Sequence, residues 1–458
     1  MGKLQVMGDN IQMVNVKVSV IMPSLNVEHY IDECLKSVVS QTLQNIEIIC
    51  VDAGSTDGTL EIIEKYASMD SRIIVVHSDR KSYGYQVNMG ISMATGKYVA
   101  ILETDDYVEP DMYEYLYLLA EENSTDITKA DFDTFSVIEN GEKCFERIKL
   151  FEDNSLYYKV TEPRTCDRLF CTDYFLWKGI YSRRFLTENN IKLNETPGAA
   201  FQDMAFMLQV LSYAHRAVYS DRSLYRYRVD REEASTFSPK ILGYGHQEFE
   251  YALSLIDEGK DIYEKGLYIH LLHSFRSELY LVLQMTGCDF ASEYVKPHYE
   301  WFIDRIQYAV DCGILDINSD VYLYETEDIK VLLGGEEGIR QAVTEIINKV
   351  SRKQEKIAET QKLCDNKPVV IFGSGRRGIN YLKQLYGKIN IVAFADNSVD
   401  RQNTIVSGFK VYSLDKCLDA YPECIYLIAV KNNAEEIVKQ IIDAGIGEKQ
   451  IINNILSE

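Results

Sequence analysis

Short apolar runs alternate with segments of helical periodicity over the first 110 residues of the chain. Each run is mostly apolar and is typical of a strand buried on both faces of a parallel sheet. The runs are Val18–Met22, Ile46–Val51, Ile73–Val76 and Tyr98–Leu102. Between them, apolar residues recur at helical spacing, as at Ile31, Leu35 and Val38. This alternation predicts an α/β fold in which helices cover both faces of a mostly parallel sheet.

The last of these runs leads directly into an acidic cluster. Glu103, Asp105 and Asp106 follow the run, with only Thr104 among them. Carboxylates at this spacing repel one another, and burying them unpaired is costly. Open α/β sheets bind ligands at the carboxyl ends of their strands, so the cluster is expected to hold a divalent cation such as Mg²⁺ or Mn²⁺. An acidic turn that faces solvent is the alternative.

Three loops at the ends of three predicted strands carry a family resemblance. The motifs are Val18–Asn26, Glu47–Thr59 and Gly96–Asp106. Taken in this order, they resemble the nucleotide-binding half of a family 2 glycosyltransferase with the GT-A nucleotide-diphospho-sugar transferase fold. The match is specific because three loops agree in sequence order, whereas any one alone is a weak signal.

The resemblance implies roles for individual residues in these loops. The residues that it places on the nucleotide are Pro23, Ser24, Asn26, Asp52 and, at the ribose, Asp105. Asp106, with Asp105 beside it, would hold the Mn²⁺ or Mg²⁺ that bridges the diphosphate. Ala53 stands where the family usually has a second aspartate, so the base of the donor stays open.

A second acidic position lies farther along the chain. Phe175–Leu186 resembles the segment that precedes the catalytic loop of the family, and Thr196–Asp203 then leads into a predicted helix. The resemblance implies that Asp203 is the general base, with Gln202 in place of the usual glutamate. A plain helix N-cap is the alternative for Asp203. Tyr225–Arg228 is either an edge that meets a sugar or phosphate, or an ordinary strand with exposed arginines.

The pattern divides the chain into three predicted parts. They are a GT-A domain over 17–240, a mainly helical region and connector over 241–365, and a small Rossmann-like domain over 366–458. In the last part, a strand leads into a glycine loop able to cradle a phosphate, and a second strand ends at an acidic residue near the expected ribose position. These candidate nucleotide-binding residues are Gly373, Gly375, Gly378 and Asp396. A structural or oligomerising role for this domain is the alternative.

Composition narrows the class of protein and its partners. The chain has 458 residues and a formal net charge of −22, which disfavours nucleic acid as a partner. Its ten cysteines include no Cys-x-x-Cys pair, which favours reduced thiols in a cytoplasmic protein. No apolar run is long enough for a transmembrane segment, so the protein is expected to be cytoplasmic or peripheral at the inner face of the membrane. A homo-oligomer is left open.

These observations lead to one principal hypothesis and two alternatives. The principal one is an inverting, metal-dependent glycosyltransferase that moves a sugar from a nucleotide-diphosphate donor to a hydroxyl of a glycan or lipid-linked acceptor, in surface polysaccharide synthesis. A NAD-dependent sugar oxidoreductase is the second, because Tyr412 and Lys416 have a Tyr-x-x-x-Lys spacing. A non-catalytic glycan-binding scaffold is the third, suggested by Ala53 and Gln202.

Overall fold

The strand β1 (Val18–Ser24) lies at the centre of the parallel part of the first sheet. It pairs in parallel with β2 (Ile46–Asp52) on one side and with β4 (Tyr98–Ile101) on the other. The strand β3 (Ile73–His77) continues the parallel ladder beyond β2. Every residue of β1, β2 and β4 is buried, as the continuous apolar runs predict. The parallel sheet expected for the first 110 residues is confirmed.

Beyond β4 the sheet becomes antiparallel. The strand β8 (Gly179–Ser182) pairs antiparallel with both β4 and β6 (Ile127–Val137), and β5 (Tyr107–Val108) pairs antiparallel with β9 (Ala217–Arg228). Within the described residues the strands form one mixed sheet in the order β3-β2-β1-β4-β8-β6-β9-β5, with β7 (Lys143–Ile148) paired to β6. The β5–β9 pairing brings the acidic segment after β4 next to the end of β9.

The computed structural model describes residues 15–137, 141–151, 154–231, 240–317, 326–430 and 432–453. The chain forms two compact units, Met1–Asp133 with Ile148–Val343, and Thr134–Arg147 with Thr344–Glu458. Over the described ranges, no helix combines the length and the apolar character needed to cross a membrane. The three-part division at 240 and 365 stays a prediction, and the helices after residue 240 up to Val343 belong to the first unit.

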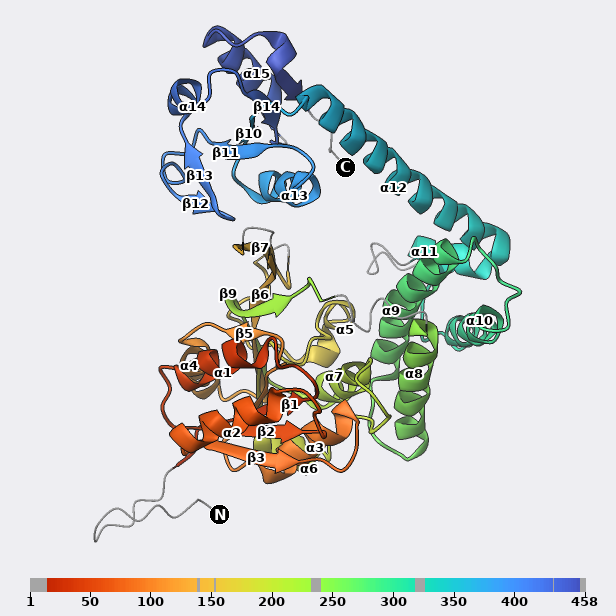
Figure 1. Ribbon diagram of the computed structural model, residues 1–458. Coiled ribbons are helices and arrows are strands. Elements are labelled where there is room, and N and C mark those ends of the chain that lie inside the picture. Colours follow the sequence, from red (N-terminus) through yellow and green to blue (C-terminus); the bar gives the residue numbers. More distant parts are fainter. Residues whose placement is uncertain are drawn as a thin grey trace. The chain divides into compact units, whose positions relative to one another are not determined.

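Helices flank the first sheet and follow it in the chain (Figure 1). They are α1 (Ile31–Val39), α2 (Thr59–Met69), α3 (Tyr83–Met93), α4 (Met112–Asn123), α5 (Leu169–Thr172), α6 (Arg183–Glu188), α7 (Gln202–Tyr213), α8 (Ile241–Asp257), α9 (Glu264–Met285), α10 (Val295–Asp311) and α11 (Thr326–Leu333). The helices α8 and α9 pack side by side (Figure 1). Phe249, Leu271 and Phe275 on these two helices are buried and belong to the core.

The second unit contains a six-stranded sheet among its described residues, reached through the long helix α12 (Glu336–Cys364). The strand order is β12-β13-β11-β10-β14-β15, and all neighbours are parallel except β12 and β13. The strands are β10 (Val369–Phe372), β11 (Ile391–Ala395), β12 (Ile405–Val406), β13 (Phe409–Tyr412), β14 (Ile425–Ile428) and β15 (Ile451–Asn453). The helices are α13 (Arg376–Leu385), α14 (Leu414–Ala420) and α15 (Ala434–Asp443). Apolar clusters cover both faces of this sheet.

Close packing of α3 gives a test of the fold of the first unit. A Cβ atom at Gly84 would lie 1.9 Å from the carbonyl oxygen of Asn194, which is backbone and cannot move away cheaply. We expect Gly84→Ala to lower the free energy of unfolding by about 1–3 kcal/mol, measured by urea denaturation. The matched control is Gly243→Ala in α8, where the nearest atoms are 3.8 Å from the built Cβ. This control is expected to leave stability unchanged or raise it, and equal losses in both variants would contradict the packing.

Candidate active site

A cavity of about 630 Å³ opens at the carboxyl ends of β1 and β4, where α/β sheets place their ligands. Its volume is in the usual range for small-molecule sites. Four segments that are far apart in the sequence supply much of its wall. They are Pro23 and Ser24 at the end of β1, Glu103 to Asp105 after β4, Gly198 to Asp203 at the start of α7, and Tyr227 and Arg228 at the end of β9. Most of the regions singled out from the sequence therefore meet at one place.

The acidic cluster divides between the cavity and the protein interior. Asp105 lines the cavity, whereas Asp106 is only 2% exposed and is not part of the wall. One oxygen of Asp106 accepts from the Tyr225 hydroxyl at 2.8 Å, and the other accepts from the Arg228 backbone N–H at 2.7 Å. Burial and the nearby Asp105 charge raise the pKa of Asp106 well above its usual range. The geometry gives Asp106 a role in holding β9, and its metal-binding role stays a prediction.

Glu103 is the second carboxylate on the cavity wall; it belongs to the acidic cluster expected to hold a cation, but the family resemblance assigned it no individual role. It accepts a hydrogen bond from the Tyr83 hydroxyl. Burial, together with the Asp105 and Asp203 charges, raises the pKa of Glu103 to about 8. Asp105 itself forms an ion pair with Arg231, with Oδ2 and Nη1 2.9 Å apart. No feature of the local sequence shows that Glu103 and Asp105 face the cavity while Asp106 does not.

The cavity carboxylates fit a cation that arrives with a phosphate ligand. Over the described residues, no group of three or more His, Cys, Asp or Glu side chains is arranged to hold a metal by itself. Glu103 and Asp105 supply hard oxygen donors, and their mutual repulsion is relieved by a divalent cation. Magnesium usually binds through one or two carboxylates together with substrate phosphates. The donor set therefore fits Mg²⁺ or Mn²⁺ shared with a diphosphate.

The other residues of the first unit that were predicted to bind the nucleotide fall into two groups. Pro23 and Ser24 lie on the cavity wall. Asn26 and Asp52 do not; instead they shape the adjoining loop, because Asn26 Oδ1 accepts from the Thr56 N–H at 2.8 Å and Asp52 Oδ2 accepts from the Gly54 N–H at 2.9 Å. Their direct contact with a nucleotide stays a prediction.

Asp203 lies on the cavity wall in the first turn of α7. The residue that caps this helix is Phe201, which has a left-handed backbone with φ 66°, so the alternative of Asp203 as the N-cap is wrong. Burial raises the pKa of Asp203 to about 6, although backbone N–H groups and the Lys129 ammonium oppose the shift. Gln202 is buried beside it and holds the preceding loop, donating to Thr196 Oγ1 at 2.9 Å.

Aromatic rings form another part of the wall. Trp177 stacks on Tyr227 with ring centroids 5.0 Å apart and planes 10° apart, and on Tyr225 at 4.3 Å. Trp177, Tyr227 and Arg228 all line the cavity. Arg226 is instead held by ion pairs with Glu109 and Asp133. The Tyr225–Arg228 segment is thus a strand that also presents an aromatic and cationic edge to the cavity.

In the second unit, Asp396, the acidic residue predicted to lie near a ribose, accepts hydrogen bonds from the glycine loop. Asp396 Oδ2 accepts from the Ser374 backbone N–H at 2.8 Å and from its hydroxyl at 2.6 Å. A Cβ atom at Gly378 would lie 1.8 Å from the Gly373 carbonyl oxygen, so α13 packs closely on the loop. Gly375 is the N-cap of α13. These contacts explain the glycines and Asp396 as elements of the loop, and a nucleotide there stays a prediction.

Comparison with known structures defines the class of fold. The chain is similar to the crystal structure of S. aureus TarS 1-349, with a TM-score of 0.51 and 21% identity, over 71% of this chain and 92% of that one. The complex of the same protein with UDP-GlcNAc gives a TM-score of 0.53 and 19% identity, over the same shares of both chains. The first unit therefore has an α/β fold with a mixed sheet of the GT-A type.

Sequence comparison gives the family. Residues 19–199 match the family described as glycosyl transferase family 2, and residues 365–452 match C2185-like, N-terminal. The chain is 31% identical to glycosyltransferase GlyG of Streptococcus pneumoniae, over 46% of this chain and 70% of that protein. The chain belongs to glycosyl transferase family 2.

Other relatives are matched over smaller shares of their length. The chain is 28% identical to glycosyltransferase GlyA of S. pneumoniae, over 49% of this chain and 32% of GlyA. It is 31% identical to the uncharacterized glycosyltransferase YibD of Escherichia coli, over 48% of this chain and 63% of YibD. The chain thus spans about a third to two thirds of the length of these relatives.

Proposed function

We propose that the protein is an inverting, metal-dependent glycosyltransferase that moves a sugar from a nucleotide-diphosphate donor to a hydroxyl of a glycan or lipid-linked acceptor. The observation that carries the proposal is one cavity that holds a carboxylate pair, Glu103 and Asp105, and a separate carboxylate, Asp203. Membership of the family and the complex of TarS with UDP-GlcNAc support a sugar-nucleotide donor. Surface polysaccharide synthesis is the process that we infer for it.

Different residues of the cavity would carry out the separate tasks of such a reaction. Asp105 and Glu103 would hold a divalent cation, which neutralises the diphosphate and stabilises it as the leaving group. Asp203 takes the proton from the acceptor hydroxyl, because direct displacement at the anomeric carbon needs a base on the opposite face. Trp177 and Tyr227 supply aromatic surface on which the apolar face of a sugar ring can rest.

For the second unit we infer a Rossmann-like domain. Its parallel strands follow the order β13-β11-β10-β14-β15, which corresponds to the order 3-2-1-4-5 of doubly wound sheets. A structural role explains the contacts of Asp396 without a ligand. A sugar oxidoreductase is less well supported. Lys416, the lysine of the Tyr-x-x-x-Lys spacing, is exposed, and its Nζ donates to Asn403 Oδ1 at 3.1 Å on the surface.

A panel assay tests the proposal against both alternatives. The full chain is incubated with uridine, guanosine and thymidine diphosphate sugars, with Mn²⁺ or with a chelator, and release of the free nucleotide is measured. We expect at least one donor to be turned over with Mn²⁺ and not with the chelator. Parallel samples with NAD and NADP measure hydride transfer. Hydride transfer without donor turnover would favour the oxidoreductase, and no turnover of any kind would favour the scaffold.

A further inference from the structure

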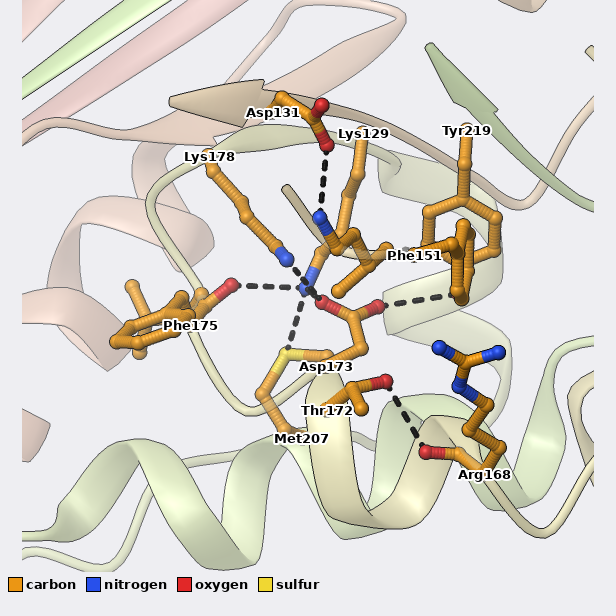
Figure 2. A network of polar contacts seen from close by, with 12 residues as sticks. Lys129, Asp131, Phe151, Arg168, Thr172, Asp173, Phe175, Lys178, Met207 and Tyr219 are labelled. Atoms are coloured by element: carbon orange, nitrogen blue, oxygen red, sulfur yellow. Dashed lines mark hydrogen bonds and ion pairs between the residues drawn. The ribbon is translucent and has the colours of Figure 1, made fainter. Parts of the chain in front are cut away.

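Behind the cavity lies a network of buried charges that the proposed reaction does not by itself require. Lys129 on β6 and Lys178 before β8 both contact Asp173, and all three side chains are almost fully buried. The Nζ atoms of the two lysines lie 2.8 and 3.1 Å from the same oxygen, Oδ1 of Asp173 (Figure 2). The Tyr219 hydroxyl donates to the other oxygen at 3.0 Å.

The network carries more positive than negative charge. Two ammonium groups face one carboxylate, so these three buried side chains together carry one excess positive charge. Burying an unbalanced charge is costly, and a lone ion pair of Asp173 with one lysine would avoid that cost. An ion pair with Asp173 therefore does not by itself explain why a second lysine is buried here.

Lys129 has further contacts that connect two parts of the cavity wall. Its Nζ donates to the Phe175 carbonyl oxygen at 2.8 Å and contacts the Met207 sulfur at 3.4 Å (Figure 2). Phe175 comes two residues before Trp177, which lines the cavity. Met207 lies four residues after Asp203 on α7, so the two share one face of that helix. One ammonium thus links the loop that carries Trp177 to the helix that carries Asp203.

The charge of Lys129 also acts on Asp203. Lys129 lowers the pKa of Asp203 against the effect of burial, while burial lowers the pKa of Lys129 itself to about 8. Lys129 is therefore cationic over the range in which Asp203 titrates. Several other titratable groups face Asp203 from the surrounding elements. They are Tyr83 on α3, Glu103 after β4, Tyr174 and Tyr181 around β8, Tyr227 on β9, Glu248 on α8 and Glu278 on α9.

We propose that Lys129 is a positioning residue for Asp203. It fixes the Trp177 loop against helix α7 and supplies the buried positive charge beside the carboxylate that takes the acceptor proton. The role rests on the proposed function of the cavity. Lys178 belongs to the same network, but the Phe175 carbonyl and the Met207 sulfur are bound by Lys129.

Two matched variants separate this role from plain stabilisation. Lys129→Met and Lys178→Met each leave one lysine paired with Asp173, so the buried network is neutral in both. We expect Lys129→Met to raise the midpoint of the acid limb of kcat/KM by about one pH unit. Lys178→Met should leave that midpoint in place. Equal midpoints in the two variants would overturn the proposal.

A third variant, with a polar side chain at position 129, keeps the test valid if Lys129→Met fails to fold. Lys129→Gln keeps an N–H donor on a shorter side chain and removes the charge, so the same rise in the midpoint is expected. Thermal melting of all three variants shows which are folded. A midpoint unchanged in a folded Lys129→Gln would also overturn the proposal.

A readout that does not depend on turnover tests the inference separately from the proposed function. The chain has two tryptophans, and Trp301 stacks on His246, which can titrate by itself. In a Trp301→Phe background, tryptophan fluorescence, excited where tyrosine does not absorb, therefore reports on Trp177 alone. We expect a transition with pH that Asp203→Asn removes and that Lys129→Met shifts upward. If the parent protein turns over no donor, the proposed function fails; if the transition stays in place in both Lys129 variants, the inference fails.

Discussion

Replacement of Asp203 by asparagine is expected to lower kcat by about 10²-fold or more, with the affinity for the donor little changed. Asparagine keeps the size of the side chain but cannot accept the proton of the acceptor hydroxyl. Because Asp203 lies in the first turn of α7 and does not cap it, the melting temperature should stay close to that of the parent. Turnover and donor binding are measured separately, by product formation and by calorimetry.

The pH dependence of the parent enzyme is a second test of the role of Asp203 as the base. The base must be unprotonated, and burial raises its pKa to about 6. The value of kcat/KM should therefore fall as the pH drops below about 6 and level off above it. The control is Asp32→Asn, an aspartate in the first turn of α1 outside the cavity, which should keep near-normal turnover. Near-normal turnover in Asp203→Asn, with a lower melting temperature, would contradict the role as base.

Alanine at Asp105 is expected to weaken ligand binding, whereas alanine at Asp106 is expected to lower the stability of the fold. Asp105→Ala should weaken Mn²⁺-dependent binding of UDP by about 100-fold or more, because it removes a carboxylate from the cavity wall. Its effect on stability should be about 1 kcal/mol or less, since it loses a partly exposed ion pair with Arg231. Asp106→Ala leaves the Tyr225 hydroxyl and the Arg228 N–H without their acceptor. We expect it to cost about 1–3 kcal/mol of stability.

Calorimetry with and without Mn²⁺, beside urea unfolding, measures both effects in both variants. The two residues are adjacent, of the same type and in the same loop, so each is a matched control for the other. A stable Asp106→Ala that no longer binds UDP with Mn²⁺ would return the metal-binding role to Asp106. Intact binding in Asp105→Ala would remove Asp105 from the proposed site.

Much of the fold follows from local patterns in the sequence. The continuous apolar runs at Val18–Met22 and Ile46–Val51 predict strands buried on both faces, and they lie side by side in the parallel ladder. The loops that follow parallel strands must meet at one edge of the sheet, which is why Ser24 and Asp105 could be placed near one another.

Only the tertiary structure decided which side chains face the cavity. Asp105 and Asp106 look alike in the sequence, and the donors that turn Asp106 inward come from β9, 119 and 122 positions away. Lys129, Asp173 and Met207 likewise meet across 44 and 78 positions. Strand and helix periodicity record whether a position is buried, but they do not record which distant group will satisfy its hydrogen bonds or its charge. The sequence by itself therefore determined the parallel part of the sheet, the family resemblance and the loops of the site, while long-range pairing of β9 and β6 determined where each carboxylate lies within it.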